Sequence, residues 1–257
     1  MEKETFTNGS NFLVRTFRNG FTEYVEQPGL IQNKGATHSS HVNGQFSRLS
    51  GTEGNDWLTA PAQSTAKWII TAGEGDDYMQ GTDNAVNLML GQEGDDYMHG
   101  SDTFKDYLYG GTGNDKIFGY GGNDILKGED GDDEILGGDG NDKLFGGKGD
   151  DQLQGGNGND LLLAGNGSNV YYGGAGADRF GLMKKHEQNV IGDFNHEEGD
   201  QLLIRKRHID SVEVSFLGNV GANGESQFML ESEMGQTGIQ TKVGTTVDDI
   251  MGAIKAI

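Results

Sequence analysis

The chain has 257 residues, including 45 glycines, two prolines and no cysteine, and its formal net charge is −21 at pH 7. The absence of cysteine excludes a disulfide framework and a thiol nucleophile. A protein this acidic is a poor partner for nucleic acid or an anionic membrane, and no apolar run approaches the length of a transmembrane helix.

The acidic charge is concentrated in the middle of the chain. Residues 51–181 contain 24 Asp and Glu against 7 Lys and Arg, a net charge of −17, whereas residues 1–50 and 182–257 have net charges of +1 and −5. Together with the repeats described below, this distribution predicts three regions. Residues 51–181 form the repeat region, and the two flanking regions are expected to be β-rich caps, which solenoid folds need at their ends.

The N-terminal cap is expected to contain short strands. Residues 14–26 indicate a hairpin with Asn19 and Gly20 in a type I′ turn. His38 and His41 have no carboxylate or cysteine near them in the sequence, so we interpret them as loop residues rather than as a metal site. The first residues lack the apolar stretch and the cleavage site of a signal peptide.

The repeats begin irregularly, over residues 51–109. Segments that start at Gly51, Ala72 and Gly91 each combine a glycine-rich turn with an acidic residue in the sixth place. Longer and less regular segments follow each of them, at residues 60–71, 81–90 and 100–109. We therefore expect irregular coils in this part of the chain.

Residues 110–181 are eight consecutive nine-residue units with the pattern G-G-x-G-x-D-x-U-x, in which U is a large apolar residue. The sixth place is Asp in seven units and Asn169 in the other. The U residues are Ile117, Leu126, Ile135, Leu144, Leu153, Leu162, Tyr171 and Phe180. A disordered Gly/Asp-rich linker is the alternative, and it is disfavoured because U is apolar in every unit.

Each unit predicts half a coil of a solenoid. Glycine allows the positive φ that a tight turn requires, and the first six residues are expected to form that turn. The remaining x-U-x is a short strand with one side chain inward and two outward. Two consecutive units complete a coil, so unit n stacks on unit n+2. The predicted fold is all-β, a right-handed parallel β-roll of two sheets.

The turns stack in two columns, and every second unit adds a carboxylate to the same column. Stacked Asp side chains repel one another unless a cation lies between them. Ligands that are all oxygen select a hard cation, and turns rich in carbonyl groups favour Ca²⁺ over Mg²⁺. The first edge has turns that start at residues 51, 72, 91, 110, 128, 146 and 164, and the second edge has acidic turns that start at 119, 137, 155 and 173. Six sites on the first edge and three on the second are possible.

The repeat resembles the RTX (repeats-in-toxin) hemolysin-type calcium-binding β-roll, as in the C-terminal modules of serralysin-type proteases, lipases and alginate epimerases. The resemblance implies a cofactor of several Ca²⁺ ions, and the possible sites on the two edges give up to about nine. In such rolls, carbonyl groups in the second and fourth places of one turn, and in the first and third places of the next stacked turn, join the two sixth-place Asp carboxylates.

These implied ligands are carried over by their place in the repeat. The side-chain ligands are Asp56, Asp77, Asp96, Asp115, Asp124, Asp133, Asp142, Asp151, Asp160 and Asp178. The remaining residues of the implied sites are Gly73, Gly75, Gly91, Glu93, Gly94, Gly110, Gly111, Thr112, Gly113, Tyr120, Gly122, Gly128, Glu129, Asp130, Gly131, Gly137, Gly138, Asp139, Gly140, Gly146, Gly147, Lys148, Gly149, Gly155, Gly156, Asn157, Gly158, Gly173 and Ala175.

Three outward aromatic residues, Trp57, Tyr78 and Tyr97, are expected in the same place on successive coils, about one strand spacing (~4.8 Å) apart. Such a ladder can stack on sugar rings, so these residues are candidates for carbohydrate binding. The alternative, which we favour, is that residues 1–50 cover them. The C-terminal segment is expected to cover the outward residues Leu161, Leu163, Val170 and Tyr172. The acids in the fifth place are expected to be solvated: Asp76, Asp95, Asp132 and Asp150.

The C-terminal region begins with a second resemblance. Residues 177–204 are similar to the closing segment of RTX rolls in secreted metalloproteases and lipases, which makes Asp193 and Asp200 candidate ligands of a last calcium site. Turn and cap packing is the alternative. Further strands are expected between residues 211 and 243. The spacing of Thr246 and Asp249 indicates a capping box, and a short amphipathic helix is expected to end the chain.

The sequence contains no recognisable catalytic motif. H-E-x-x-H and G-x-S-x-G are both absent, and the segment before the repeats is too short for the catalytic domain of a protease or lipase. We therefore expect no enzymatic activity, with a small enzyme of unfamiliar type as the alternative.

The favoured function is that of a secreted protein that folds on binding Ca²⁺ outside a Gram-negative cell. The resemblance implies export by type I secretion machinery through an uncleaved C-terminal signal. Residues 255–257 lack the acidic residue followed by three apolar ones that ends many such signals. The alternative is a carbohydrate-binding or adhesive surface module, or a non-catalytic module of a larger secreted enzyme, with a polysaccharide or a cell surface as partner.

Overall fold

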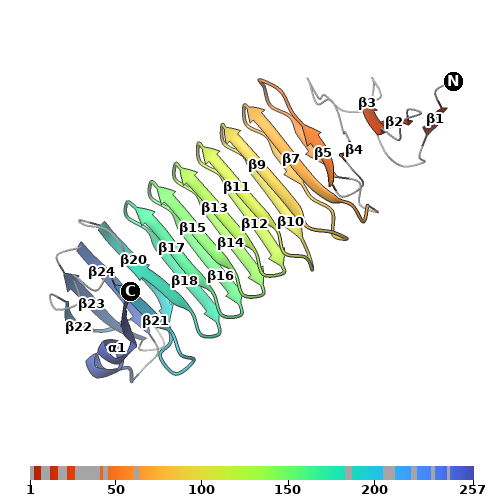
Figure 1. Ribbon diagram of the computed structural model, residues 1–257. Helices are drawn as coiled ribbons and strands as arrows, with labels where there is room; N and C mark the ends of the chain where they lie inside the picture. Colours follow the sequence, from red (N-terminus) through yellow and green to blue (C-terminus); the bar gives the residue numbers. More distant parts are fainter. Residues whose placement is uncertain are drawn as a thin grey trace.

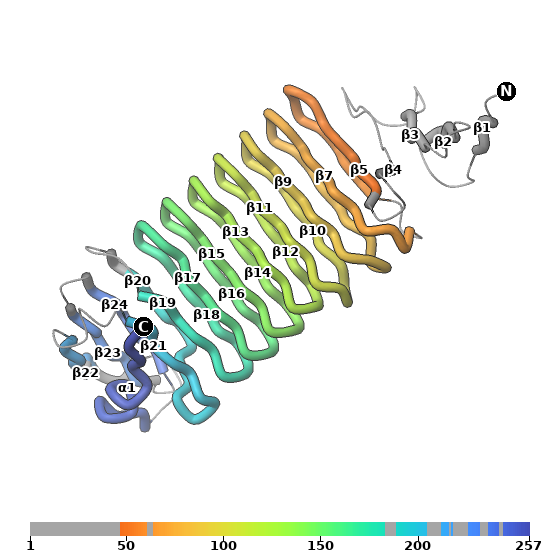
Figure 2. Tube along the Cα trace, in the orientation of Figure 1, coloured from red at the N-terminus to blue at the C-terminus, as the bar shows by residue number. Residues whose placement is uncertain are grey.

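The computed structural model describes residues 3–6, 12–16, 22–26, 41–42, 46–60, 64–182, 187–204, 212–220, 225–232, 235–241 and 244–257. In this part of the chain the strands form two sheets of eleven strands each and a separate three-stranded sheet. From β5 to β20, successive strands alternate between the two large sheets, so the chain winds as a solenoid (Figures 1 and 2). The predicted all-β parallel β-roll is confirmed.

We name the two large sheets by their strand numbers. The even sheet runs, in spatial order, β22 (Glu213–Val220), β23 (Glu225–Ser232), β24 (Gly235–Thr241), β20 (Glu187–Phe194), β18 (Val170–Ala175), β16 (Gln152–Asn157), β14 (Glu134–Asp139), β12 (Lys116–Gly121), β10 (Tyr97–Ser101), β8 (Tyr78–Gln80) and β6 (Trp57–Thr59). The odd sheet runs β25 (Ile254–Ala256), β21 (Gln201–Ile204), β19 (Arg179–Leu182), β17 (Leu161–Asn166), β15 (Lys143–Lys148), β13 (Ile125–Asp130), β11 (Tyr107–Thr112), β9 (Asn87–Glu93), β7 (Lys67–Glu74), β5 (Phe46–Ser50) and β4 (His41–Val42).

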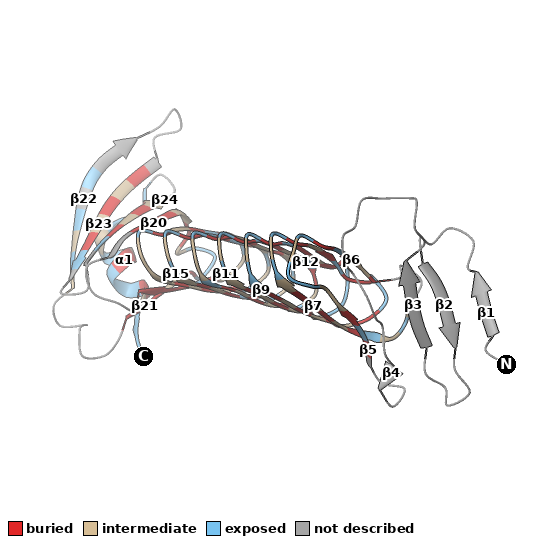
Figure 3. Ribbon diagram, turned by 90° about the horizontal axis from the view of Figure 1, so that it is seen from above, coloured by how far each residue is buried: buried red, intermediate tan, exposed pale blue. Residues whose placement is uncertain are grey.

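The strands stack in the predicted register, with two units per coil. In the odd sheet Leu126 of β13 lies opposite Leu144 of β15, which lies opposite Leu162 of β17. These three side chains are fully buried, as are the other U residues of the regular block. Buried positions alternate with half-buried or exposed ones along the regular strands, and Figure 3 shows buried segments along the whole solenoid. The core is therefore a narrow column to which each half-coil contributes one large side chain.

The regular strands are longer than predicted. They cover six residues instead of three, because pairing resumes beyond the first-place glycine and includes the second and third places of the unit. Positive φ at glycines such as Gly138 (110°) bends the chain there without breaking the stacking between coils. The unpaired part of each turn is thereby reduced to the fourth, fifth and sixth places.

Parallel stacking also extends beyond residues 51–181 at both ends. Strand β5 pairs in parallel with β7, so the stack begins at Phe46. At the other end β20 stacks on β18 and β21 stacks on β19. The strands expected between residues 211 and 243 are present as β22, β23 and β24, and they extend the even sheet as an antiparallel meander beside β20.

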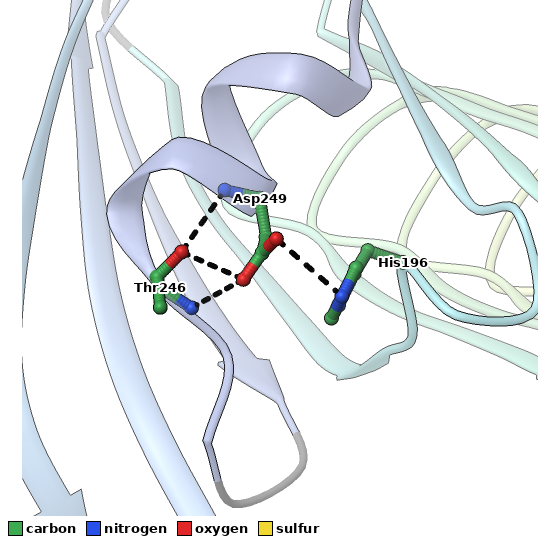
Figure 4. A network of polar contacts seen from close by, with 3 residues as sticks. All are labelled: His196, Thr246 and Asp249. Carbon is green, nitrogen blue, oxygen red and sulfur yellow. Dashed lines mark hydrogen bonds and ion pairs between the residues drawn. The ribbon is translucent and has the colours of Figure 1, made fainter.

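The C-terminus differs from the predicted terminal helix. The capping box is confirmed: Thr246 and Asp249 each accept a hydrogen bond from the other's backbone N–H at the start of α1 (Val247–Ala253), and His196 lies near Asp249 (Figure 4). The helix ends at Ala253, however, and Ile254–Ala256 forms β25 alongside β21. The open edge of β21 offers the β-branched Ile254 a strand partner, which ends the helix one turn early.

The N-terminal strands form the separate three-stranded sheet of β1 (Lys3–Phe6), β2 (Phe12–Thr16) and β3 (Thr22–Glu26). Strands β2 and β3 pair antiparallel, as the predicted hairpin requires. The predicted turn at Asn19 and Gly20 lies outside the described residues, as does His38. In the described part of the chain, no helix is long and apolar enough to cross a membrane.

Candidate metal centre

The sixth-place Asp residues form a hydrogen-bonded ladder along each edge of the roll. On the first edge the backbone N–H of Asp115 donates to Oδ1 of Asp133 (2.8 Å), and that of Asp133 donates to Oδ1 of Asp151 (3.1 Å). On the second edge the N–H of Asp124 donates to Asp142 in the same way (2.8 Å). One carboxylate oxygen of each residue after the first thus holds the turn of the preceding coil. In Asp56, which begins the ladder, Oδ2 instead accepts from the N–H (2.6 Å) and the hydroxyl (3.1 Å) of Thr52 in its own turn.

The other oxygen of these carboxylates has no partner. Among the described residues, ten Asp carboxylates bury one oxygen without a hydrogen bond: Asp56, Asp77, Asp96, Asp115, Asp124, Asp133, Asp142, Asp151, Asp160 and Asp178. They are the ten side-chain ligands implied by the sequence, and each residue is at most 4% exposed. A buried carboxylate that lacks a partner is costly, so the turns require something that supplies positive charge.

Burial raises the pKa of nine of these carboxyl groups above the ordinary value of 3.8, and the charges of stacked neighbours raise most of them further. The pKa rises to about 8 for Asp115 and Asp124, to about 7 for Asp96, Asp133, Asp151 and Asp160, and to about 6 for Asp77, Asp142 and Asp178. At neutral pH the metal-free roll therefore holds carboxyl groups that resist ionisation.

In the regular units the unpaired oxygen faces a space beside the first-place glycine. A Cβ on Gly110 would lie 1.9 Å from Oδ2 of Asp115 and 2.8 Å from the carbonyl oxygen of Gly128 on the next coil. The same pair of oxygens, one carboxylate and one first-place carbonyl of the next turn, converges at Gly91, Gly119, Gly137, Gly146 and Gly155. A carboxylate and a carbonyl that the sequence assigned to one site are therefore adjacent.

The other implied carbonyl groups also lie between stacked turns. A Cβ on Gly131 would lie 1.8 Å from the carbonyl oxygen of Gly113, and a Cβ on Gly147 would lie 1.9 Å from that of Glu129, so fourth-place and second-place carbonyls point at the next turn. The third-place carbonyl of Asp130 accepts a hydrogen bond from the N–H of Gly113 (2.9 Å) and has a second lone pair.

The donor set fits calcium. All of the converging groups are oxygens, which hard cations prefer, and most are neutral backbone carbonyls, which calcium sites commonly use. The part of the chain that the structure describes contains no cluster of three or more His, Cys, Asp or Glu side chains of the kind that binds a metal by side chains alone. Sites built from two carboxylates and several carbonyls agree with that finding.

Two candidate ligands from the closing segment have their carboxylates occupied by the backbone. Asp193 accepts hydrogen bonds from the N–H groups of Gly173 (2.9 Å) and Gly174 (2.8 Å). Asp200 accepts from the N–H groups of Asp178 and Asn195, both at 2.8 Å. Asp200 thus ends the ladder of the second edge, and Asp193 caps its last turn, in line with the packing alternative.

Asn169 continues the ladder of the first edge without its charge. Its Oδ1 accepts a hydrogen bond from the N–H of Asp151 (2.8 Å), as a sixth-place Asp would. Its Nδ2 donates to the carbonyl of Gly167 (3.4 Å). The pair formed by Asp151 and Asn169 therefore has one carboxylate instead of two.

The fifth-place residues form a second ladder, which reasoning from the sequence missed. Oδ1 of Asp76 accepts a hydrogen bond from the N–H of Asp95 (3.0 Å), and Oδ1 of Asp132 accepts one from the N–H of Asp150 (2.7 Å). These acids are exposed, but they also link coils, so the view that they are only solvated is incomplete. Asn141 and Asn159 continue the pattern on the second edge. The repeated Asn or Asp before the sixth place was the available signal.

The outward aromatic residues stack on one another. The ring centroids of Trp57 and Tyr78 are 4.1 Å apart, and those of Tyr78 and Tyr97 are 5.8 Å apart with an interplanar angle of 11°. Trp57 is 49% and Tyr97 is 37% exposed. Because Tyr78 lies between Trp57 and Tyr97, both of its faces meet another ring, which disfavours stacking of a sugar on that residue. Residues 1–50 are expected to cover this ladder, and the side chains of residues 1–46 lie outside the described part of the chain.

The residues expected to lie under the C-terminal segment are only partly covered. Leu161, Leu163 and Val170 are half-buried, and Tyr172 is 39% exposed. A Cβ on Gly192 of β20 would lie 2.3 Å from Cε1 of Tyr172, so the following coil packs directly against that ring.

The fold and the turns define the protein as a parallel β-roll whose stacked turns present repeated oxygen ligands. The family model of the RTX calcium-binding nonapeptide repeat (4 copies) matches residues 101–135, 118–153 and 145–180. The chain accordingly carries RTX hemolysin-type calcium-binding repeats. A comparison with curated proteins gave no match.

Proposed function

We propose that this calcium-binding repeat protein is secreted and that its roll folds when Ca²⁺ becomes available outside the cell. The observation that carries the proposal is the row of ten buried carboxylate oxygens without a partner. Bound Ca²⁺ supplies the positive charge that these stacked carboxylates lack. The chain contributes two carboxylates to a site wherever two consecutive sixth-place residues have an unpaired oxygen.

This criterion supports eight full sites, not nine. Consecutive Asp residues from Asp56 to Asp151 form five such pairs on the first edge, and those from Asp124 to Asp178 form three on the second. The sixth pair of the first edge contains Asn169, whose amide carries no charge. A site there would have one carboxylate and is expected to be weaker.

The ligand chemistry also favours an extracellular role. Flexible, carbonyl-rich sites of extracellular modules bind Ca²⁺ with dissociation constants of about 10⁻⁴–10⁻³ M. Free calcium in the cytosol lies far below that range, so the acidic repeat region would stay unfolded and export-competent inside the cell. Export by a type I system from a Gram-negative cell, through a signal in the C-terminal segment, is part of the proposal.

We further propose that the protein has no enzymatic activity of its own. The aromatic ladder over β6, β8 and β10 favours one second candidate function, binding to a surface polysaccharide, because Trp57 is half exposed. The mutual stacking of its rings weighs against that candidate.

Circular dichroism of the full chain in chelator and in millimolar calcium tests the proposed function. The expected result is a largely disordered spectrum in chelator that becomes β-rich on addition of calcium. A spectrum that is already fully β-rich in chelator at neutral pH would overturn the proposal.

A further inference from the structure

The sixth-place positions of the second edge change in character along the roll. Trp68 of β7 lies opposite Asn87 of β9. The N–H of Asn87 donates to Oδ1 of Asp106 (2.6 Å), and the N–H of Asp106 donates to Oδ1 of Asp124 (2.7 Å). One ladder position is therefore filled in turn by an indole, an amide and two carboxylates. Asp124 is the first of the series with an unpaired oxygen.

The amide NH₂ group of Asn87 binds the oxygens of its turn, as a cation is expected to do in the regular turns. Its Nδ2 donates to the carbonyl oxygens of Thr82 and Ala85, both at 3.2 Å, and to Oδ1 of Asp106 (3.0 Å). Its Oδ1 accepts from the N–H of Thr82 (3.0 Å). The residue is fully buried, and both polar atoms of its side chain are paired. The NH₂ group thus gathers carbonyl and carboxylate oxygens around one donor.

Asp106 is satisfied by its own turn. Its Oδ2 accepts hydrogen bonds from the N–H of Ser101 (2.6 Å) and from the hydroxyl of the same residue (2.7 Å). Its Oδ1 is held by Asn87, so neither oxygen requires a metal. This separates Asp106 from the ten Asp residues that each bury one unpaired oxygen.

Trp68 fills the first of these positions and packs against the apolar core. Its side chain is 2% exposed and lies in the core, and its Nε1 donates to the hydroxyl of Ser64 (3.0 Å). The hydroxyl of Thr82 donates to the carbonyl of Ser64 (3.1 Å), which links this turn to the next. An indole offers no ligand to a hard cation.

We propose that apolar packing and hydrogen bonds, rather than calcium, hold the turns of the second edge together from Trp68 to Asp106. Strands β7, β9 and β11 then stay packed on that side when calcium is removed. The inference rests on the proposed function and refines it, because calcium folding then starts from a preformed segment. On the first edge of the same coils, Asp77 and Asp96 keep unpaired oxygens. That edge is expected to open in chelator while the second stays closed.

Trp68 reports on the proposal directly. The chain contains two tryptophans, so Trp57→Phe leaves Trp68 as the only one. In the full chain with this background, we expect Trp68 emission to be blue-shifted and protected from acrylamide in chelator. Calcium should leave the emission unchanged while circular dichroism of the same sample gains β structure.

A matched pair of variants identifies the cause. Asn87→Asp removes the two amide donors and adds a carboxylate beside Asp106, so Trp68 emission should shift to the red in chelator and become calcium-dependent. Asn84→Asp adds the same charge at an exposed position of the same turn and should leave the emission as it was.

Each adverse result has a distinct meaning. Red-shifted, quenchable Trp68 in chelator, combined with calcium-dependent circular dichroism, would overturn the inference and leave the proposed function intact. An equal red shift of Trp68 emission in Asn87→Asp and Asn84→Asp would also overturn it, since the added charge alone would then explain the effect. A fully β-rich chain in chelator would instead refute calcium-gated folding itself.

Discussion

Replacing Asp133 with asparagine should stabilise the roll in chelator and destabilise it in calcium. The Asn side chain can still accept the hydrogen bond that Asp115 donates to Oδ1, as Asn169 does for Asp151. The unpaired, buried oxygen is replaced by an NH₂ group without charge. The variant therefore changes the charge of the position and leaves the ladder in place.

The magnitude in calcium follows from the pairs in which Asp133 takes part. One filled site adds RT ln(1 + [Ca²⁺]/Kd) to the free energy of unfolding, about 1.4 kcal/mol at a calcium concentration ten times Kd. Asp133 belongs to two pairs, with Asp115 and with Asp151, so its replacement should cost up to about 3 kcal/mol. Asp56 begins the ladder and belongs to one pair, so Asp56→Asn should cost about half as much.

Urea unfolding followed by circular dichroism in saturating calcium measures the loss, and the β content of the metal-free chain in chelator, also from circular dichroism, measures the gain. The expected outcome is a change of sign between the two conditions for Asp133→Asn, and a smaller loss in calcium for Asp56→Asn. Equal losses at the two positions would refute the bridging of adjacent sites. Lower stability of Asp133→Asn in both conditions would refute the claim that the buried carboxylate destabilises the metal-free roll.

Two further predictions concern the turns. Gly140→Ala places a Cβ 1.4 Å from the carbonyl oxygen of Gly122 at a φ of 135°, so the free energy of unfolding in calcium should fall by more than about 2 kcal/mol. Gly54 occupies the same place in its turn with no atom within 4 Å of a Cβ, and Gly54→Ala should stay within about 0.5 kcal/mol of the wild type; a similar loss for both would contradict the steric argument. In chelator, acidification should restore β structure, because the buried carboxyl groups have pKa values raised from 3.8 to between about 6 and 8. Folded-state stability is then complete below the ordinary pKa and is lost as the pH rises through the raised values, so a circular dichroism titration without gain of β structure on acidification would contradict the pKa shifts.

The register of the roll could be predicted because every coil repeats the same pattern of glycine, aspartate and apolar residues. A single apolar residue every nine positions, such as Leu126 or Leu144, can only be buried if alternate units stack. The pairing of sixth-place Asp residues follows from that stacking. The sequence pattern therefore determines which side chains become neighbours.

The remaining features depend on contacts that the pattern does not encode. Asp193 and Asp200 are candidate ligands by resemblance, and the pattern does not encode that each of their oxygens accepts a backbone hydrogen bond. Asn87 lies in an irregular turn, and its role becomes visible only when the strand register aligns it with Asp106. The helix at the C-terminus ends early because β21 offers a free edge, which is a property of the assembled sheet.

The irregular coils show where this architecture tolerates a change of length. From residue 51 to residue 169, turns of the first edge keep six residues in every coil, so the extra residues of the longer coils in this range fall on the second edge, as in the seven-residue segments 81–87 and 100–106. Duplication of two consecutive units adds a complete coil and preserves both ladders. Duplication of a single unit would exchange the two edges for every coil that follows, and duplication of residues 72–80 would set Trp68 and Asn87 against the unpaired carboxylate of Asp77. Growth of the roll is thus expected to proceed by whole coils, with single insertions confined to one side.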